Sequence, residues 1–251
     1  MGHIKKIIKQ LMGIDTGFSY DFYKNGEYDL IKKLSKLKFN ILFDVGAHHG
    51  EWSLVANKFF PNSTIHTFEI SESNYRKSLD KLNKDTFIIN NFGFSNKQGN
   101  IEYKDYGLNS QINTTILESA FHDANVKYDI KKTLMKTGDN YCKEKNISHI
   151  DLLKIDTEGS EHLVLEGFDN ILQKKNVRLI QFEYGYANGD AKFLMKDFFI
   201  FFKKNNYIVA KLRKKIKFEK WNYSFNDFKS GPNYIAIKED DYEIRSLLEN
   251  N

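Results

Sequence analysis

Short apolar runs recur along the first two thirds of the chain, and patterns typical of amphipathic helices separate them. Such runs predict buried strands, here at residues 41–43, 65–68, 87–89, 152–155 and 179–182. Helical patterns follow Gly50 and Gly159. Strands that alternate with helices form parallel sheets through right-handed crossovers. We therefore predict an α/β fold whose ligand site lies beyond the carboxyl ends of the strands.

The last third of the chain continues this pattern differently. An apolar helical stretch at 193–202 precedes two strand-like runs at 207–212 and 234–237. A helix, a strand and a closing hairpin strand would add two members to the five parallel strands. The expected architecture is a seven-stranded, mostly parallel sheet with one antiparallel strand and helices on both faces.

The domain organisation follows from length and composition. The chain has 251 residues, two prolines and no Gly/Ser/Pro-rich linker, so we expect one domain over residues 39–251. Residues 1–38 predict a helical N-terminal extension. In the extension, apolar residues at 4, 7, 8, 11 and 12 share a helix face. That face would lie on a membrane surface, or it would dock on this domain or on a second copy in a homodimer.

Charge and cysteine content limit the partners and the compartment. The net charge of +5 is spread over many lysines, which argues against a nucleic-acid partner. Cys142 is the single cysteine, so the chain has no internal disulfide, and this favours a reducing compartment. The longest apolar run, 198–202, is far shorter than the about 20 residues that span a membrane. These features predict a cytoplasmic location.

A glycine-containing turn, DVGAHHG at residues 44–50, follows the first predicted strand and opens a helix. Its spacing is G-x-x-x-G, whereas dinucleotide-binding turns have G-x-G-x-x-G. The carboxylate of Asp44 beside this turn would repel a phosphate and would suit a cationic ligand. The turn therefore counts against an NAD-dependent oxidoreductase.

Carboxylates end three of the predicted strands. Glu69 follows the second strand, where a carboxylate can accept both hydroxyls of a ribose. Asp156 follows the fourth strand and Glu183 ends the fifth. Asp156 could take a proton from an alcohol nucleophile, or Asp156 and Glu183 could share a hard cation such as Mg²⁺. Glu158 is a further candidate catalytic residue, although an acid at a helix start is also favoured by the helix dipole.

Three stretches together resemble a known family: DVGA with Gly50, the Phe68-Glu69 pair, and LKIDTEGSE at 153–161. They are similar to the FkbM-type S-adenosylmethionine-dependent methyltransferases, over roughly residues 40–185. The resemblance implies a class I, Rossmann-like methyltransferase fold and methyl transfer to a hydroxyl, often on a sugar of a surface polysaccharide or on a natural product. His48 departs from the family, which usually has asparagine there. The implied S-adenosylmethionine contacts are Asp44, Gly46, Ala47, His48, Gly50, Glu69, Asn91, Phe92 and Gly93.

The sequence gives less support to other functions. Methyltransferases of base amino groups carry an Asn/Asp-Pro-Pro-aromatic run after the fourth strand, where this chain reads DTEG at 156–159. A non-catalytic binding protein with the same fold stays an alternative. The acceptor would meet a polar loop at 107–111, which could be a lid, and aromatics that could stack on sugar rings: Tyr184, Tyr186, Trp221 and Tyr223.

The densest basic run of the chain lies between residues 211 and 220. It is either a solvated hairpin face or a flap over an anionic acceptor. Its cationic members are Lys211, Arg213, Lys214, Lys215, Lys217 and Lys220.

Overall fold

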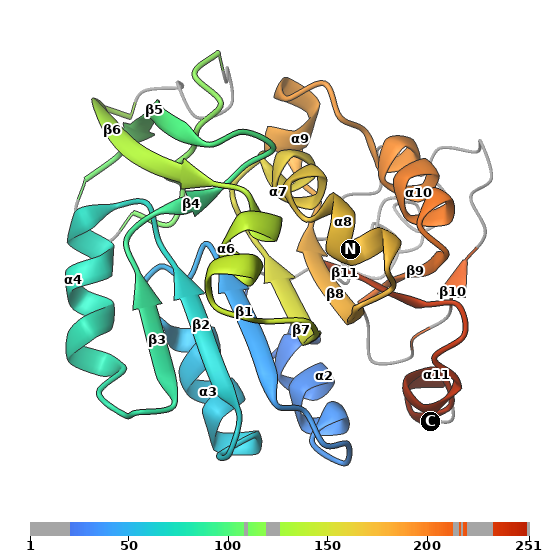
Figure 1. Cartoon of the computed structure of the whole chain (residues 1–251). Coiled ribbons are helices and arrows are strands. Elements are labelled where there is room, and N and C mark those ends of the chain that lie inside the picture. The colour runs from blue at the N-terminus through green and yellow to red at the C-terminus, as the bar shows by residue number, and fades with distance from the viewer. Residues whose placement is uncertain are drawn as a thin grey trace, which may run out of the picture.

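The computed structural model describes residues 21–107, 110–118, 126–212, 216, 218–219 and 233–249. In this part of the chain the main sheet has the strand order β10-β9-β11-β8-β7-β1-β2-β3 (Figure 1). The strands are β1 (Ile41–Val45), β2 (Thr64–Phe68), β3 (Phe87–Asn90), β7 (Ile150–Ile155), β8 (Val177–Glu183), β9 (Tyr207–Lys211), β10 (Phe218–Glu219) and β11 (Asn233–Lys238).

The strand directions match the predicted sheet. β3, β2, β1, β7 and β8 pair in parallel, and β11 is antiparallel to both β8 and β9. This confirms a seven-stranded, mostly parallel sheet with one antiparallel member. The structure adds the two-residue β10, which pairs with β9 at the edge of the sheet. None of the described helices is long and apolar enough to cross a membrane.

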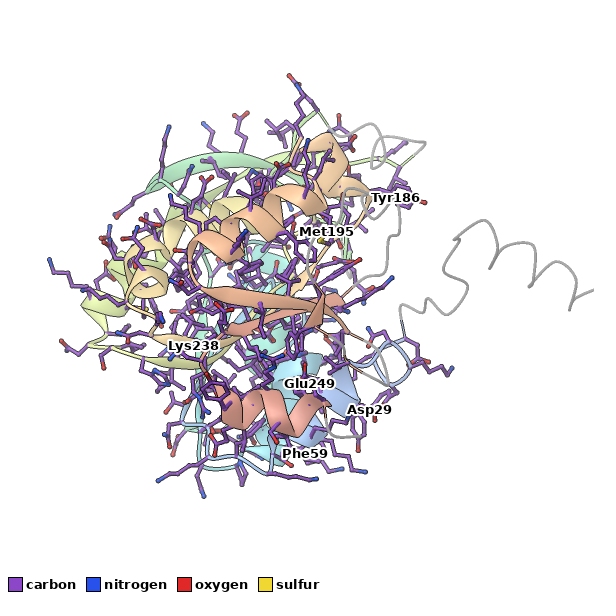
Figure 2. The ribbon with its side chains drawn as sticks, turned by 90° about the vertical axis from the view of Figure 1, so that its right-hand side faces the viewer. Asp29, Phe59, Tyr186, Met195, Lys238 and Glu249 are labelled. Atoms are coloured by element: carbon purple, nitrogen blue, oxygen red, sulfur yellow. The ribbon has the colours of Figure 1, made fainter. Side chains whose placement is uncertain are left out.

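Helices cover both faces of the sheet because successive strand residues point to opposite sides. In β7, Leu152 packs with the helices of one face and Leu153 with those of the other, and both are fully buried. The first face carries α2 (Glu27–Leu34), α3 (Glu51–Phe59) and α11 (Tyr242–Glu249); Figure 2 shows Asp29, Phe59 and Glu249 of these helices at one end of the molecule. The second face carries α6 (Gly138–Glu144), α7 (Glu161–Gly167), α8 (Asp169–Gln173) and α10 (Met195–Lys204).

A second sheet, which the sequence analysis did not predict, consists of β4 (Gly93–Phe94), β6 (Asp129–Lys136) and β5 (Gly99–Asp105), in that spatial order. It lies above the carboxyl ends of β2 and β3 (Figure 1). β6 reads DIKKTLMK and is mostly exposed, so it lacks the apolar run that marks a buried strand. Two further helices complete the described elements: α4 (Glu72–Lys81) and α9 (Tyr186–Asp190).

The described end of the N-terminal extension is part of the packed domain. α2 buries Leu30, Ile31 and Leu34, and it packs against α3 and α11. The predicted helix at 4–12 lies outside the described residues, so its membrane and homodimer alternatives stay predictions. The domain boundary after residue 38 is likewise a prediction.

Candidate active site

A cavity of about 690 Å³ lies at the carboxyl edge of the parallel strands. The turns that follow β1, β2, β7 and β8 form its walls, together with residues of the second sheet and of the segment before α2. Ligand sites of open α/β sheets occur at this edge, because the loops that carry function leave the strands there.

The glycine turn after β1 passes directly beside the turn after β7. Gly46 has φ 79°, and a Cβ there would overlap the carbonyl oxygen of Asp156. The backbone N–H groups of Gly46 and Ala47 both donate to the carbonyl of Phe68, at 3.0 Å. Gly46, Ala47 and His48 therefore line the cavity. Gly50 does not, because it caps the start of α3 with its α-carbon against Leu82.

Asp44 does not lie in the cavity, where the sequence placed it. It was expected to face a cationic ligand, but it is fully buried in β1 and does not line the cavity. Its carboxylate accepts hydrogen bonds from Ser53 Oγ at 2.7 Å and from Lys154 Nζ at 3.1 Å. Lys154 therefore compensates the negative charge of Asp44, which was expected to pair with a cationic ligand.

Glu69 lines the cavity beside the glycine turn. Its Oε2 accepts from the backbone N–H of His48 and its Oε1 from that of Ser71, both at 2.8 Å. Burial raises the pKa of Glu69 to about 7, although these two N–H groups favour the ionised form. Each carboxylate oxygen keeps a second lone pair that can accept a ligand hydroxyl.

The segment after β3 contributes only one of its three predicted residues. Gly93 lines the cavity, whereas Asn91 and Phe92 do not. Asn91 Nδ2 donates to the carbonyl of Glu69 at 2.9 Å, and the Phe92 ring packs against Phe68. Both side chains thus pack against the end of β2 and the turn that follows it, on the side away from the cavity. The apolar side chains that line this part of the cavity are those of Ile70, Phe94 and Met135.

Lys154, to which the sequence analysis gave no role, connects the two walls of the cavity. Its buried Nζ lies 3.1 Å from Asp44 Oδ1 and 3.3 Å from Asp156 Oδ2. Burial opposes its charge, but Asp44, Asp156 and Glu27 outweigh this and raise the pKa of Lys154. The signal was a lysine inside the apolar run IDLLKI, because a buried charge must have a partner.

Asp156, Glu158 and Glu183 line the cavity together. A ligand oxygen from each lies within 4.8 Å of the others, and Asp156 shares a hydrogen bond with Glu183. Burial opposes ionisation of all three. Lys154 nevertheless holds the pKa of Asp156 below its usual value, whereas burial and the charge of Asp156 raise those of Glu158 and Glu183 well above theirs. Asp156 is therefore the member of the cluster that ionises most readily, and Glu158 and Glu183 hold their protons more tightly than ordinary glutamates do.

Glu161 belongs to the structure of the turn rather than to the cavity wall. Its buried carboxylate accepts from the backbone N–H of Thr157 at 2.7 Å and from Asn188 Nδ2 at 2.6 Å. These bonds hold the turn after β7 against α9. The conformation of this turn is unusual, because Glu158 has φ 53° and Gly159 has φ 105°.

The segment at the start of α2 forms an unexpected part of the wall, with Phe22, Asn25 and Glu27. The buried carboxylate of Glu27 accepts from Gln181 Nε2 at 2.6 Å and from Asn233 Nδ2 at 3.1 Å. Burial raises the pKa of Glu27. The sequence left open whether the N-terminal extension docks on this domain, and no local pattern indicates that its Glu27 reaches the sheet.

The rim of the cavity is polar with one exposed aromatic ring. Tyr186, at the start of α9, has 63% of its surface exposed and lies at the rim (Figure 2). Tyr184 is buried in the core and does not line the cavity. Ser110 and Gln111 of the predicted lid line it, and Asn74 Nδ2 donates to the carbonyl of Ser110 at 3.1 Å.

Several predicted acceptor residues lie outside the described residues. They are Leu108 and Asn109 of the lid, Trp221 and Tyr223, and every cation of the basic run except Lys211. The hairpin beneath this run is present, because β10 pairs antiparallel with β9. Whether the run faces an anionic acceptor stays a prediction.

The chain is similar in fold to several solved structures. The FkbM methyltransferase of Methylobacillus flagellatus is 11% identical with a TM-score of 0.50; the match covers 79% of this chain and 43% of that one. This chain thus spans less than half the length of that structure. Precorrin-6y C5,15-methyltransferase of Geobacter metallireducens is 14% identical with a TM-score of 0.44, over 90% and 93% of the two chains.

A third structure, an rRNA methylase of Streptococcus thermophilus, is 10% identical with a TM-score of 0.39, over 84% and 93% of the two chains. No curated protein sequence matches this chain. Residues 44–209, which run from the glycine turn through β9, match the methyltransferase FkbM domain. The chain therefore belongs to the FkbM methyltransferase family.

Proposed function

We propose that this protein is an S-adenosylmethionine-dependent O-methyltransferase that acts on a hydroxyl of a sugar or of a related natural-product precursor. The observation that carries the proposal is the two-ended cavity. One end has the glycine turn and Glu69, and the other has the Asp156, Glu158 and Glu183 cluster. The first end suits a nucleoside cofactor, and the second suits a hydroxyl that must lose a proton.

The first end fits S-adenosylmethionine on three counts. Glu69 has lone pairs for the ribose hydroxyls, and Gly46 and Ala47 bring backbone close to the cavity. Ile70, Phe94 and Met135 offer an apolar surface for the adenine. When bound, the cofactor supplies an activated methyl group on a sulfonium.

At the second end, Asp156 is the group that takes the proton. Lys154 at 3.3 Å keeps Asp156 ionised, so its carboxylate can accept a hydrogen bond from the acceptor hydroxyl. The hydroxyl proton becomes strongly acidic as the new C–O bond forms, so a carboxylate of low pKa is a sufficient acceptor. Glu183 shares a hydrogen bond with Asp156 and stabilises its charge before the transfer.

The surroundings of this cluster support a sugar acceptor. Asn25, Asn188 and Asn233 line the cavity at the acceptor end. One N–H of each amide group donates to Glu27 or Glu161, and the second N–H can meet a sugar hydroxyl. Sugars are bound by such polar groups together with an aromatic platform, and the exposed ring of Tyr186 is suited to that role. We propose a small or glycan acceptor rather than a nucleic acid, and a cytoplasmic location.

The three clustered carboxyl groups favour a second version of the mechanism, in which Asp156 and Glu183 hold a divalent cation such as Mg²⁺. Such a cation binds carboxylate oxygens and lowers the pKa of a bound hydroxyl. It would have to replace the hydrogen bond between Asp156 and Glu183 and sit near the charge of Lys154. Methyl transfer measured after dialysis against a chelator, with and without added Mg²⁺, distinguishes the two versions.

Calorimetric titration with S-adenosylhomocysteine tests the proposal, with NAD as the control ligand. We expect micromolar binding that Glu69→Ala abolishes. Asp156→Asn should keep this affinity, while it abolishes methyl transfer from labelled S-adenosylmethionine to a panel of sugars and glycosides. Wild-type turnover in Asp156→Asn would reject the assigned base. A wild-type protein that does not bind S-adenosylhomocysteine would instead favour the non-catalytic alternative.

A further inference from the structure

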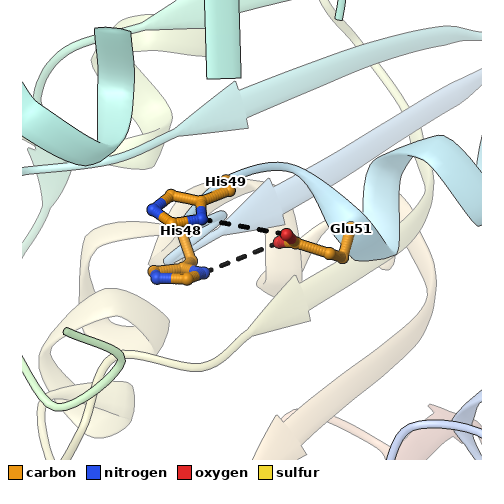
Figure 3. A group of neighbouring side chains, drawn as sticks. All are labelled: His48, His49 and Glu51. Carbon is orange, nitrogen blue, oxygen red and sulfur yellow. Dashed lines mark ion pairs between the residues drawn. The ribbon is translucent and has the colours of Figure 1, made fainter. Parts of the chain in front are cut away.

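Two neighbouring histidines and a glutamate form a compact group where the glycine turn enters α3 (Figure 3). The rings of His48 and His49 stack with centroids 3.6 Å apart and an interplanar angle of 22°. The Nδ1 atoms of both rings face the carboxylate of Glu51, at 3.6 Å from His48 and 3.9 Å from His49. The two histidines offer one ring nitrogen each and Glu51 offers a carboxylate oxygen, and these three atoms lie within 4.8 Å of one another.

The hydrogen bonds of Asn74 determine which nitrogen of His49 carries the proton. Asn74 Nδ2 donates to the carbonyl of Ser110 at 3.1 Å, so its Oδ1 is the atom that faces His49 Nε2, also at 3.1 Å. An amide oxygen only accepts, so Nε2 of His49 carries the hydrogen and Nδ1 carries the lone pair. That lone pair faces the carboxylate of Glu51. Two acceptors that face each other need a cation, and Lys81, which pairs with the same oxygen of Glu51, supplies one when no metal ion is bound.

We propose that His48 Nδ1, His49 Nδ1 and the Glu51 carboxylate bind one zinc-class transition-metal ion. Two imidazoles and a carboxylate suit Zn²⁺ or Co²⁺ better than Mg²⁺, which prefers oxygen ligands. A tetrahedral ion with bonds of about 2.0–2.2 Å sets its ligand atoms about 3.3–3.5 Å apart. The Nδ1 atoms lie 3.6 Å from Oε2 and 3.9 Å from Oε1 of Glu51, so both carboxylate oxygens face the site. The two stacked rings have to rotate apart before both lone pairs point at one ion.

The bond from His49 to Asn74 is the support that metal-bound histidines usually have. A histidine that binds a metal typically donates its other ring N–H to an oxygen, which fixes both the tautomer and the ring orientation. Asn74 has this role here and is itself buried and fixed by Ser110. The fourth position of the ion is left to water or to a ligand, because the described residues provide three ligand groups.

Lys81 competes with the ion. Its Nζ lies 2.5 Å from Glu51 Oε1, and both side chains are substantially exposed, Lys81 at 41% and Glu51 at 58%. An exposed lysine can leave its partner at small cost, since exposed ion pairs contribute only about 0–1 kcal/mol. Removal of Lys81 should therefore strengthen metal binding, whereas removal of Glu51 should weaken it. A purely structural ion-pair group would not respond in opposite directions.

The site does not depend on the proposed function, although the two are adjacent. His48 and Glu51 line the cavity, and the backbone N–H of His48 donates to Glu69. An ion bound here would fix the turn that forms this wall of the cavity. Its presence can be tested without any cofactor or acceptor.

The test uses the full chain without an affinity tag, after treatment with a chelator. Titration with Co²⁺, followed by the visible absorption of the tetrahedral ion, and with Zn²⁺ by calorimetry should show one ion per chain. Glu51→Gln and His49→Ala should each weaken binding at least about tenfold, and Asn74→Ala about tenfold. Lys81→Met should strengthen it. Because Glu51 is exposed, Glu51→Gln should fold normally, which circular dichroism checks.

Two controls separate this site from other metal ligands of the chain. His149→Ala removes an exposed histidine that pairs with Asp151 at 3.0 Å, and it should leave binding unchanged. Glu183→Gln alters the acidic cluster and should also keep one ion per chain. The proposal is overturned if the wild type binds no Co²⁺ or Zn²⁺, or if Glu51→Gln binds as tightly as the wild type. Loss of the ion in Glu183→Gln alone would place it in the acidic cluster and overturn the proposal as well.

Discussion

The two ends of the cavity are built in different ways. The end with the glycine turn uses backbone geometry and one carboxylate, at Gly46, Ala47 and Glu69, which follow two neighbouring strands. The other end joins Glu27 and Lys154 with residues that follow β7 and β8, and its properties depend on charges that compensate one another. A site formed by backbone turns can be recognised in the sequence by the spacing of its glycines and acids. A site formed by charges that compensate one another can be recognised only in the folded structure, where distant segments come into contact.

The largest expected effect is at Lys154, in the end that contains Asp156. Lys154→Met would leave the buried carboxylate of Asp44 and the half-buried carboxylate of Asp156 without their cation. Removal of one partner from a buried ion pair costs about 3–5 kcal/mol, and we expect the free energy of unfolding to fall by that amount. Denaturant unfolding measures it.

A matched control is Lys175→Met. Lys175 pairs with Asp240 at 2.9 Å, and both side chains are exposed. This substitution should cost at most about 1 kcal/mol. Equal losses in the two variants would show that the charges at the acceptor end are not coupled as described.

At the glycine end the largest effect should come from Gly46→Ala. The added Cβ would overlap the carbonyl oxygen of Asp156, and alanine rarely adopts φ 79°. Strain and displacement of the turn should lower the free energy of unfolding by about 2–4 kcal/mol and abolish binding of S-adenosylhomocysteine. Gly189→Ala is the control, because nothing lies within 4 Å of its added Cβ. Similar stabilities of the two variants would contradict a close approach of the turns.

Glu27→Gln tests whether the ends are independent. The new amide group would face the amide donors of Gln181 and Asn233, which now bond to the carboxylate. We expect a loss of about 1–2 kcal/mol in the free energy of unfolding, since a buried donor is left unsatisfied. The affinity for S-adenosylhomocysteine, measured by calorimetry, should stay unchanged. A parallel loss of that affinity would show that the two ends are coupled.

The difference between local patterns and distant contacts also explains which parts of the fold and of the site could be predicted from the sequence. The seven main strands have apolar runs, so they were predictable, whereas the exposed β6 has none and its sheet was missed. Glu69 was placed beside the glycine turn by its spacing alone. The role of Asp44 was wrong, because its partner Lys154 is 110 residues away in the sequence. Only tertiary contact reveals such compensation.

The smallest expected effect concerns Glu69 and depends on pH. Its pKa is raised to about 7 by burial, so near pH 6 its carboxyl group is mostly protonated and near pH 8 mostly ionised. Ribose hydroxyls donate hydrogen bonds, so they should favour the ionised form. The affinity for S-adenosylhomocysteine should therefore rise by up to about tenfold between pH 6 and pH 8, in line with the fraction ionised.

Glu69→Gln provides the control, because an amide in its place does not titrate. In this variant the affinity for S-adenosylhomocysteine should be weaker at every pH and nearly constant from pH 6 to pH 8. If it keeps the wild-type pH dependence, the titrating group lies elsewhere in the cavity, and His48, whose backbone N–H bonds to Glu69, is the next side chain to replace. If the wild type shows no dependence, the carboxylate is already ionised without ligand. The two backbone N–H groups on Glu69 would then outweigh its burial, and the glycine end would bind the ribose with a carboxylate that is ionised throughout this pH range.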